Sequence, residues 1–187
     1  MKNKKDLWTI VMAVALGSTI LVACGAPDTP TPTLSASEHI KQGVEYFEQG
    51  MLDKAIAEFK EAIRINPDDA DAHDNLGVAY YEQGNLNEAI AEHKEAIRLN
   101  PDHANAHIFL GIAYAEQGRL DEAIAEWKET IRLDPDHALA HKNLGLVYAD
   151  QDKADEAIAE FETYLRLWPD APDRAEVEQA IAKLKGQ

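Results

Sequence analysis

A period of 34 residues runs through most of this 187-residue chain. Proline, glycine, tyrosine and alanine each recur at this interval, and an aromatic or imidazole ring follows each alanine by four residues. The recurring sets are Pro67, Pro101, Pro135 and Pro169; Gly43, Gly77, Gly111 and Gly145; Tyr46, Tyr80, Tyr114 and Tyr148; Ala55, Ala89, Ala123 and Ala157; and Phe59, His93, Trp127 and Phe161. Such a period indicates a stack of similar supersecondary units.

Each period has the pattern of two helices joined by a short turn, as in residues 104–118 followed by 119–134. Pro135 should end the second helix, because its ring biases the preceding residue away from the helical region. Gly118 lies in the turn, where a positive φ is convenient, and Asp152 takes this place in the last period. Glycine inside a helix costs about 1 kcal/mol relative to alanine. We therefore expect Gly111 and Ala123 to let two helix backbones approach closely.

This pattern resembles the tetratricopeptide repeat, in four copies at 36–69, 70–103, 104–137 and 138–171. The resemblance implies an all-α solenoid, a right-handed superhelix of helix-turn-helix repeats. The segment 172–187 is predicted to be a capping helix, with Val177, Ile181 and Leu184 on one face. Tyr164 stands where earlier copies have smaller residues, which predicts that the fourth copy is the last. Ser35 and Glu38 have the spacing of a capping box, so the first helix should begin there.

In this family the first helices of the copies usually line a concave groove that holds a peptide or helix. The predicted groove begins with Ile40, Val44 and Phe47 in copy one, and about half of the groove positions should pack between copies instead. Tyr81 and Phe109 are the predicted anchors, and Asn75 and Asn143 are predicted to hydrogen-bond a bound backbone. The predicted peptide-binding residues are Asn75, Val78, Tyr81, Ile108, Phe109, Ile112, Lys142, Asn143 and Leu146.

The amino terminus has the pattern of an export signal, with three lysines before an uncharged run at 7–23. Leu21, Val22, Ala23 and Cys24 resemble the lipobox of bacterial lipoproteins. We therefore expect 1–23 to be a signal peptide, Cys24 to be lipidated, and 24–35 to be a proline- and threonine-rich spacer. An uncleaved membrane anchor is the alternative. The expected location is the cell envelope, attached to a membrane on the extracytoplasmic side, either periplasmic or at the cell surface.

Composition and the absence of certain motifs disfavour two classes of function. The net charge is −16, from 18 basic and 34 acidic residues, and without 1–23 it is −18. Nucleic-acid binding is therefore disfavoured, because it depends on clusters of Lys and Arg. The sequence contains no nucleophile elbow and no phosphate-binding loop, so we expect no enzymatic activity and no cofactor.

Histidines provide the one pattern that suggests a metal. His103 and His107 lie four residues apart, as do His137 and His141. The repeat explains them better, because His107 and His141 share one register position and His103 and His137 share another. His93 occupies a core ring position and should be buried and hydrogen-bonded.

The sequence therefore predicts a lipid-anchored scaffold that binds a protein or peptide partner. A narrower alternative is an assembly factor for a pilus or secretion pore. An enzyme or metal-binding protein is the alternative from another class.

Overall fold

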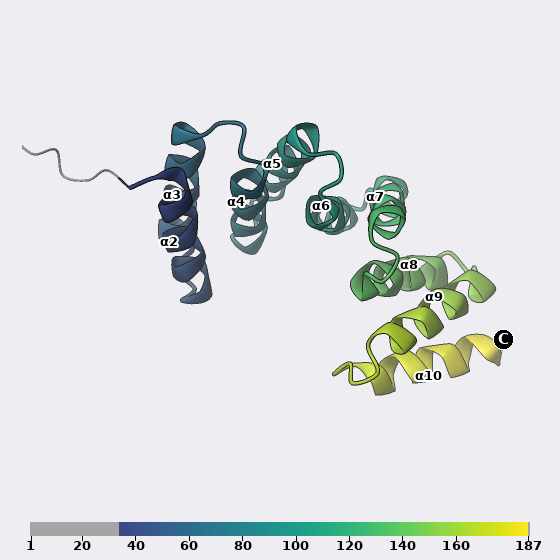
Figure 1. Cartoon of the computed structure of the whole chain (residues 1–187). Helices are drawn as coiled ribbons and strands as arrows, with labels where there is room; N and C mark the ends of the chain where they lie inside the picture. Colours follow the sequence, from purple (N-terminus) through teal and green to yellow (C-terminus); the bar gives the residue numbers. More distant parts are fainter. Residues whose placement is uncertain (1–33, 187) are drawn as a thin grey trace, which may run out of the picture. The chain divides into compact units, whose positions relative to one another are not determined.

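A computed structural model describes residues 34–186, and within that range the chain forms nine helices and no strand (Figure 1). The predicted signal peptide at 1–23, the predicted lipidation site Cys24 and most of the predicted spacer lie outside the described residues. Among residues 34–186, no helix has both the length and the apolar character needed to cross a membrane.

The helices form four consecutive pairs followed by a single helix. The pairs are α2 (Ala36–Glu48) with α3 (Leu52–Ile65), α4 (Ala70–Glu82) with α5 (Leu86–Leu99), α6 (Ala104–Glu116) with α7 (Leu120–Leu133), and α8 (Ala138–Asp150) with α9 (Ala154–Leu167), and α10 (Arg174–Lys185) follows. The second helix of each of the first three pairs also packs against the first helix of the next pair, and α4 contacts both α2 and α6. The predicted all-α repeat solenoid is thus confirmed.

The glycine inside each first helix makes room for a ring of the second helix. A Cβ atom at Gly111 would lie 2.6 Å from Cδ1 of Trp127, and one at Gly43 would lie 2.5 Å from Cε1 of Phe59. Ala123 is fully buried, as predicted for a close contact. However, the group that approaches Gly111 is the indole of Trp127 and not a helix backbone, which corrects our expectation for this position.

Turns and helix ends agree with the local sequence signals. Gly118 has a φ of 74°, and Asp152 adopts a φ of 58° in the equivalent turn of the fourth copy. Helix α7 ends at Leu133, and Asp134 before the proline is extended, with φ −133° and ψ 91°. At the start of α2, Ser35 and Glu38 form the predicted capping box, since the backbone amide of Ser35 donates to the Glu38 carboxylate and the amide of Glu38 donates to Ser35 Oγ.

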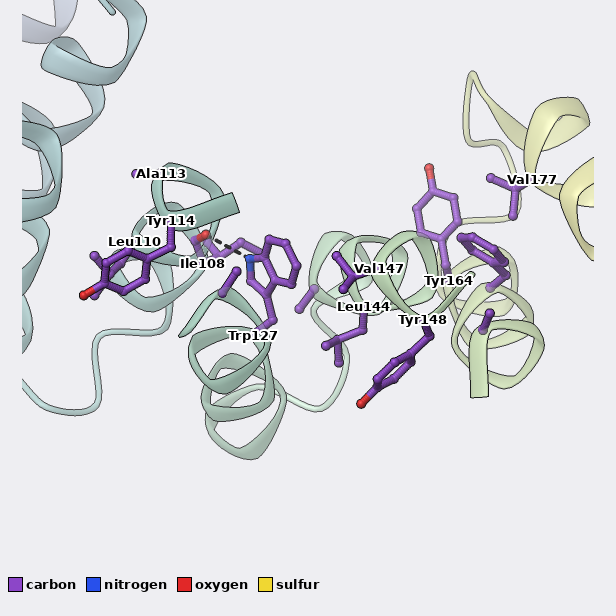
Figure 2. Close-up of a cluster of buried hydrophobic side chains, with 14 of the residues drawn as sticks. Ile108, Leu110, Ala113, Tyr114, Trp127, Leu144, Val147, Tyr148, Tyr164 and Val177 are labelled. Carbon is purple, nitrogen blue, oxygen red and sulfur yellow. Dashed lines mark hydrogen bonds between the residues drawn. The ribbon is translucent and has the colours of Figure 1, made fainter. Parts of the chain in front are cut away.

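The fourth copy is closed by α10. Val177 and Ile181 are buried in the core, and Leu184 packs against it, so the predicted capping face is confirmed. Tyr164 is 1% exposed, and its hydroxyl donates a hydrogen bond to Oδ1 of Asp173 at 2.5 Å. Asp173 is the residue directly before α10. In the view of Figure 2, the ring of Tyr164 lies between Val147 of α8 and Val177 of α10. The larger side chain of Tyr164 therefore packs against the capping helix α10, in the place where a further copy would otherwise pack.

Candidate peptide-binding face

The predicted binding residues lie on the first helices of copies two to four, and we call them the first-helix face. They are Asn75, Val78 and Tyr81 on α4, Ile108, Phe109 and Ile112 on α6, and Lys142, Asn143 and Leu146 on α8. Seven of the nine are partly exposed, Leu146 is exposed, and Ile108 is buried. The structure thus leaves most of the predicted face accessible.

Ile108 does not belong to the accessible face. It is 3% exposed and packs in the main hydrophobic cluster. Its carbonyl accepts a hydrogen bond from Nε1–H of Trp127 at 3.3 Å, which Figure 2 shows as a dashed line. The prediction that Ile108 contacts a peptide is corrected, because its side chain is buried in the hydrophobic core.

Phe109 and Tyr81 are partly buried rather than free anchors. The ring of Phe109 stacks on the imidazole of His93, with centroids 5.8 Å apart and an interplanar angle of 11°. Burial raises the pKa of the Tyr81 phenol, and the carboxylates of Glu116 and Glu82 raise it further. Both side chains are partly exposed and pack against the main hydrophobic cluster.

Lys142 forms an ion pair with Asp173, the residue directly before the capping helix α10. Its Nζ lies 2.5 Å from Oδ2 of Asp173 and 5.8 Å from the ring centroid of Tyr164. Hydrogen bonds from Lys142 and from Tyr164 lower the pKa of the Asp173 carboxyl. Burial, together with the hydrogen bond to Asp173 and its charge, raises the pKa of Tyr164 to about 12. Lys142 thus has a structural contact at the start of α10, and its predicted contact with a peptide stays a prediction.

The most exposed apolar side chains of the first helices lie on α8. Leu146 is 48% exposed, and Leu139, seven residues earlier on the same side of the helix, is 43% exposed. Leu146 also lines a pocket of about 270 Å³ that has both apolar and charged walls. The apolar residues are Ala149, Phe161, Ala180 and Leu184, and the charged residues are Asp150, Asp152 and Lys183. Sequence reasoning missed Leu139, although its spacing from Leu146 would have placed both on one face.

Copy two contains a buried polar pair that the sequence predicted only in part. His93 is fully buried, and its Nδ1 lies 2.9 Å from Oδ1 of Asp74, so the expected burial and hydrogen bond are confirmed. Its Nε2 is buried without a partner in the described structure. The partner Asp74 was not predicted, although it lies 19 residues before His93, at the same separation as Ile108 and Trp127.

The same separation of 19 residues defines a second repeated contact. In every copy a histidine near the start of the first helix bonds a glutamate of the second helix through Nδ1, at 2.6 to 2.7 Å. The pairs are His39 with Glu58, His73 with Glu92, His107 with Glu126, and His141 with Glu160. The last three histidines also reach a proline carbonyl through Nε2, at 3.1 to 3.2 Å.

Hydrogen bonds engage three of the four histidines that suggested a metal site, and the contacts above account for His107 and His141. His103 accepts the amide hydrogen of Ala106 at Nδ1, and its Nε2 lies 3.0 Å from Asp71. Nδ1 of His137 is buried without a protein partner. Residues 34–186 contain no group of three or more His, Cys, Asp and Glu side chains placed to hold a metal ion.

Comparisons with known proteins agree with this architecture. A family model described as TPR repeat matches residues 43–84 and 77–118, and one described as Tetratricopeptide repeat matches 110–172. No curated protein matches the chain in sequence.

Several solved structures share the fold. The structure of MamA is 29% identical, with 79% of this chain and 81% of that chain covered and a TM-score of 0.66. TTC0263, a TPR protein of Thermus thermophilus, is 27% identical, with 80% and 81% covered and a TM-score of 0.65. The structure of pilF of Pseudomonas aeruginosa is 28% identical, with 80% and 67% covered and a TM-score of 0.72. Since the two family models together span residues 43–172, the chain belongs to the tetratricopeptide repeat family.

Proposed function

We propose that this chain is a non-enzymatic scaffold that binds a peptide or helix of a protein partner on the first-helix face. Tetratricopeptide repeat proteins bind protein or peptide partners, and scaffolds of this family are generally not enzymes. The observation that carries the proposal is the exposure of Leu146, a residue of the first-helix face, and of Leu139 two turns earlier on the same side of α8. Neighbouring exposed apolar side chains commonly mark an interaction surface.

The sharpest test removes these two leucines. We expect Leu139→Ser with Leu146→Ser to keep the helical circular dichroism and to abolish capture of a crosslinked partner from cell-envelope extract. Ile65→Ser with Leu120→Ser is the matched control, because these side chains are 41% and 37% exposed but lie on second helices. Tyr81 and Phe109 are less suitable, since truncation of Phe109 would uncover His93.

Two results would contradict the proposal. Either the Leu139 and Leu146 variant captures the partner as well as the unmodified chain, or the control variant loses it equally. If the captured partner is a subunit of a pilus or secretion pore, the narrower role as an assembly factor is favoured.

We further propose that the scaffold is tethered to a bacterial envelope membrane, on its extracytoplasmic side, through a lipid on Cys24. The support is in the sequence, where the only cysteine follows an uncharged run of 17 residues and directly precedes the proline-containing segment. Two or three acyl chains would make attachment effectively permanent, since each buried CH₂ adds about 0.8 kcal/mol.

Cys24→Ser should leave an unprocessed precursor that does not incorporate a fatty-acid analogue during growth in a bacterial host. The unmodified chain, expressed in parallel, should be labelled and shortened. Equal labelling of both proteins would contradict lipidation at this residue.

A further inference from the structure

The first-helix face differs from the second helices in its charged residues. The second helices α3, α5, α7 and α9 carry eight Lys and Arg residues in total, whereas the first helices carry only Lys41 and Lys142. Helices α4 and α6 have none, and Lys142 is bonded to Asp173. The partly exposed apolar residues of α4 and α6 therefore lie on helices that supply no cation.

Each first helix also ends in an acidic residue. These residues are Glu48, Glu82, Glu116 and Asp150, all exposed and separated by 34 residues. A carboxylate is unfavourable at the carboxyl end of a helix, where the helix dipole is already negative. Within residues 34–186 none of the four forms an ion pair, whereas the repeated Glu61, Glu95 and Glu129 of the second helices pair with Arg64, Arg98 and Arg132. Local stability therefore does not explain the four carboxylates.

Two of these carboxylates meet beside a ring of the first-helix face. Glu82 and Glu116 line a pocket of about 270 Å³ together with Tyr81, Gly84 and Leu86. The lining contains two carboxylates, one phenol ring and one apolar side chain, and it includes no Lys or Arg. Both carboxylates raise the pKa of Tyr81, as expected where no cation offsets their charge.

This lining matches one kind of side chain especially well. A guanidinium stacks on an aromatic ring and bonds carboxylates through its planar fork of N–H donors. The apolar residues Val78, Phe109 and Ile112 lie on α4 and α6, the helices that supply Tyr81 and Glu116. The surface thus combines a site for a cation with sites for apolar side chains.

We propose that the segment bound on the first-helix face is amphipathic and cationic, and that one of its arginines occupies the pocket between Tyr81, Glu82 and Glu116. This inference rests on the proposed peptide-binding function and specifies the chemistry of the partner. An acidic segment would be repelled, because like charges across an interface oppose binding.

Synthetic peptides test the inference on the full-length chain. The probe is a fluorescein-labelled peptide of about 14 residues in which apolar residues, Leu or Ala, alternate with Arg. In the matched probe, Gln replaces every Arg. We expect the Arg peptide to bind at least about tenfold more tightly by fluorescence anisotropy and to weaken with added salt. Glu82→Gln with Glu116→Gln should remove most of this preference.

Glu88→Gln with Glu156→Gln is the matched control, because it removes two exposed carboxylates from second helices and changes the net charge equally. It should bind the Arg peptide as tightly as the unmodified chain. If the Gln peptide binds as tightly as the Arg peptide, or if both double variants weaken binding equally, the face binds peptides but the cationic inference is wrong. If neither peptide binds at millimolar concentration, both the inference and the proposed function are wrong.

Discussion

Copies two (70–103) and three (104–137) place different chemistry at the same core position. In copy three the pair is Ile108 and Trp127, and the indole N–H donates to a backbone carbonyl. In copy two the pair is Asp74 and His93, which bond to each other. Both rings lie over a glycine of the first helix, Gly111 or Gly77. The repeat therefore fixes where a ring must lie, while its polarity can change if the residue 19 positions earlier changes with it.

The two residue pairs should contribute differently to the free energy of unfolding. The indole of Trp127 buries a large apolar area and satisfies its single donor. The imidazole of His93 is smaller, and its Nε2 is buried without a partner in the described structure. An unsatisfied buried polar group costs free energy of folding. Copy two should therefore be the less stable neighbour.

The largest expected effect is the loss of the ring in copy three. Trp127→Ala should lower the free energy of unfolding by about 4 kcal/mol, because it creates a large cavity beside Gly111. His93→Ala should cost about half as much, since a smaller ring with an unpaired nitrogen is removed. Urea denaturation of both variants measures the difference, and equal losses would show that the two copies contribute equally.

The second effect separates the polar pair of copy two. Asp74→Ala should lower the free energy of unfolding by about 2.5 kcal/mol, because it leaves both nitrogens of buried His93 without a partner. Asp74→Ile combined with His93→Phe would install the pair that copy one has at Ile40 and Phe59. We expect this double variant to be at least as stable as the unmodified chain.

The double variant is decisive for the comparison. A double variant less stable than Asp74→Ala alone would show that copy two depends on its polar pair for more than mutual hydrogen bonding. A stable double variant would show that the backbone accepts either pair.

A third effect concerns the histidine contact that both copies share. Burial lowers the pKa of His107, but its bonds to Glu126 and to the Pro101 carbonyl, with the charges of Glu126 and Glu129, raise it above 6.5 overall. A pKa raised in the folded state stabilises the fold fully below the unfolded value of 6.5, and this contribution is lost as the pH rises through the folded value.

His107→Gln should therefore lower the free energy of unfolding by about 1.5 kcal/mol near pH 6 and by less near pH 8. Denaturation at both pH values measures this difference, and NMR titration of the His107 ring checks the direction of the pKa shift. A loss that is larger at the higher pH would contradict the assigned direction.

The smallest effect should be the same in both copies. Gly84 and Gly118 have φ values of 83° and 74°, and no atom lies within 4 Å of a Cβ built on either. Alanine at either position should cost about 1 kcal/mol, from backbone strain alone. Thermal denaturation should give equal shifts for Gly84→Ala and Gly118→Ala, and unequal shifts would mean that the copies differ in their turns as well as in their cores.

Much of the fold follows from signals that act over a few residues. The proline at 135 ends α7, the Ser35 capping box begins α2, and the residues with positive φ form the turns between paired helices. Each depends on local backbone geometry, which is why sequence alone predicts it. The fourfold recurrence of the 34-residue period then predicts four helix pairs, which stack because each pair must bury its apolar faces against a neighbour.

The face available to a partner was decided by the tertiary structure. Ile108 and Phe109 are adjacent in sequence, but only Ile108 is buried, in a cluster that includes Trp127 of the paired helix. Lys142 has the register of a groove residue, yet Asp173 binds it from 31 residues away. Burial and ion pairing depend on side chains that packing brings together across the chain. The sequence alone therefore determined the repeat and its turns, while packing determined which side chains of the first helices remain exposed.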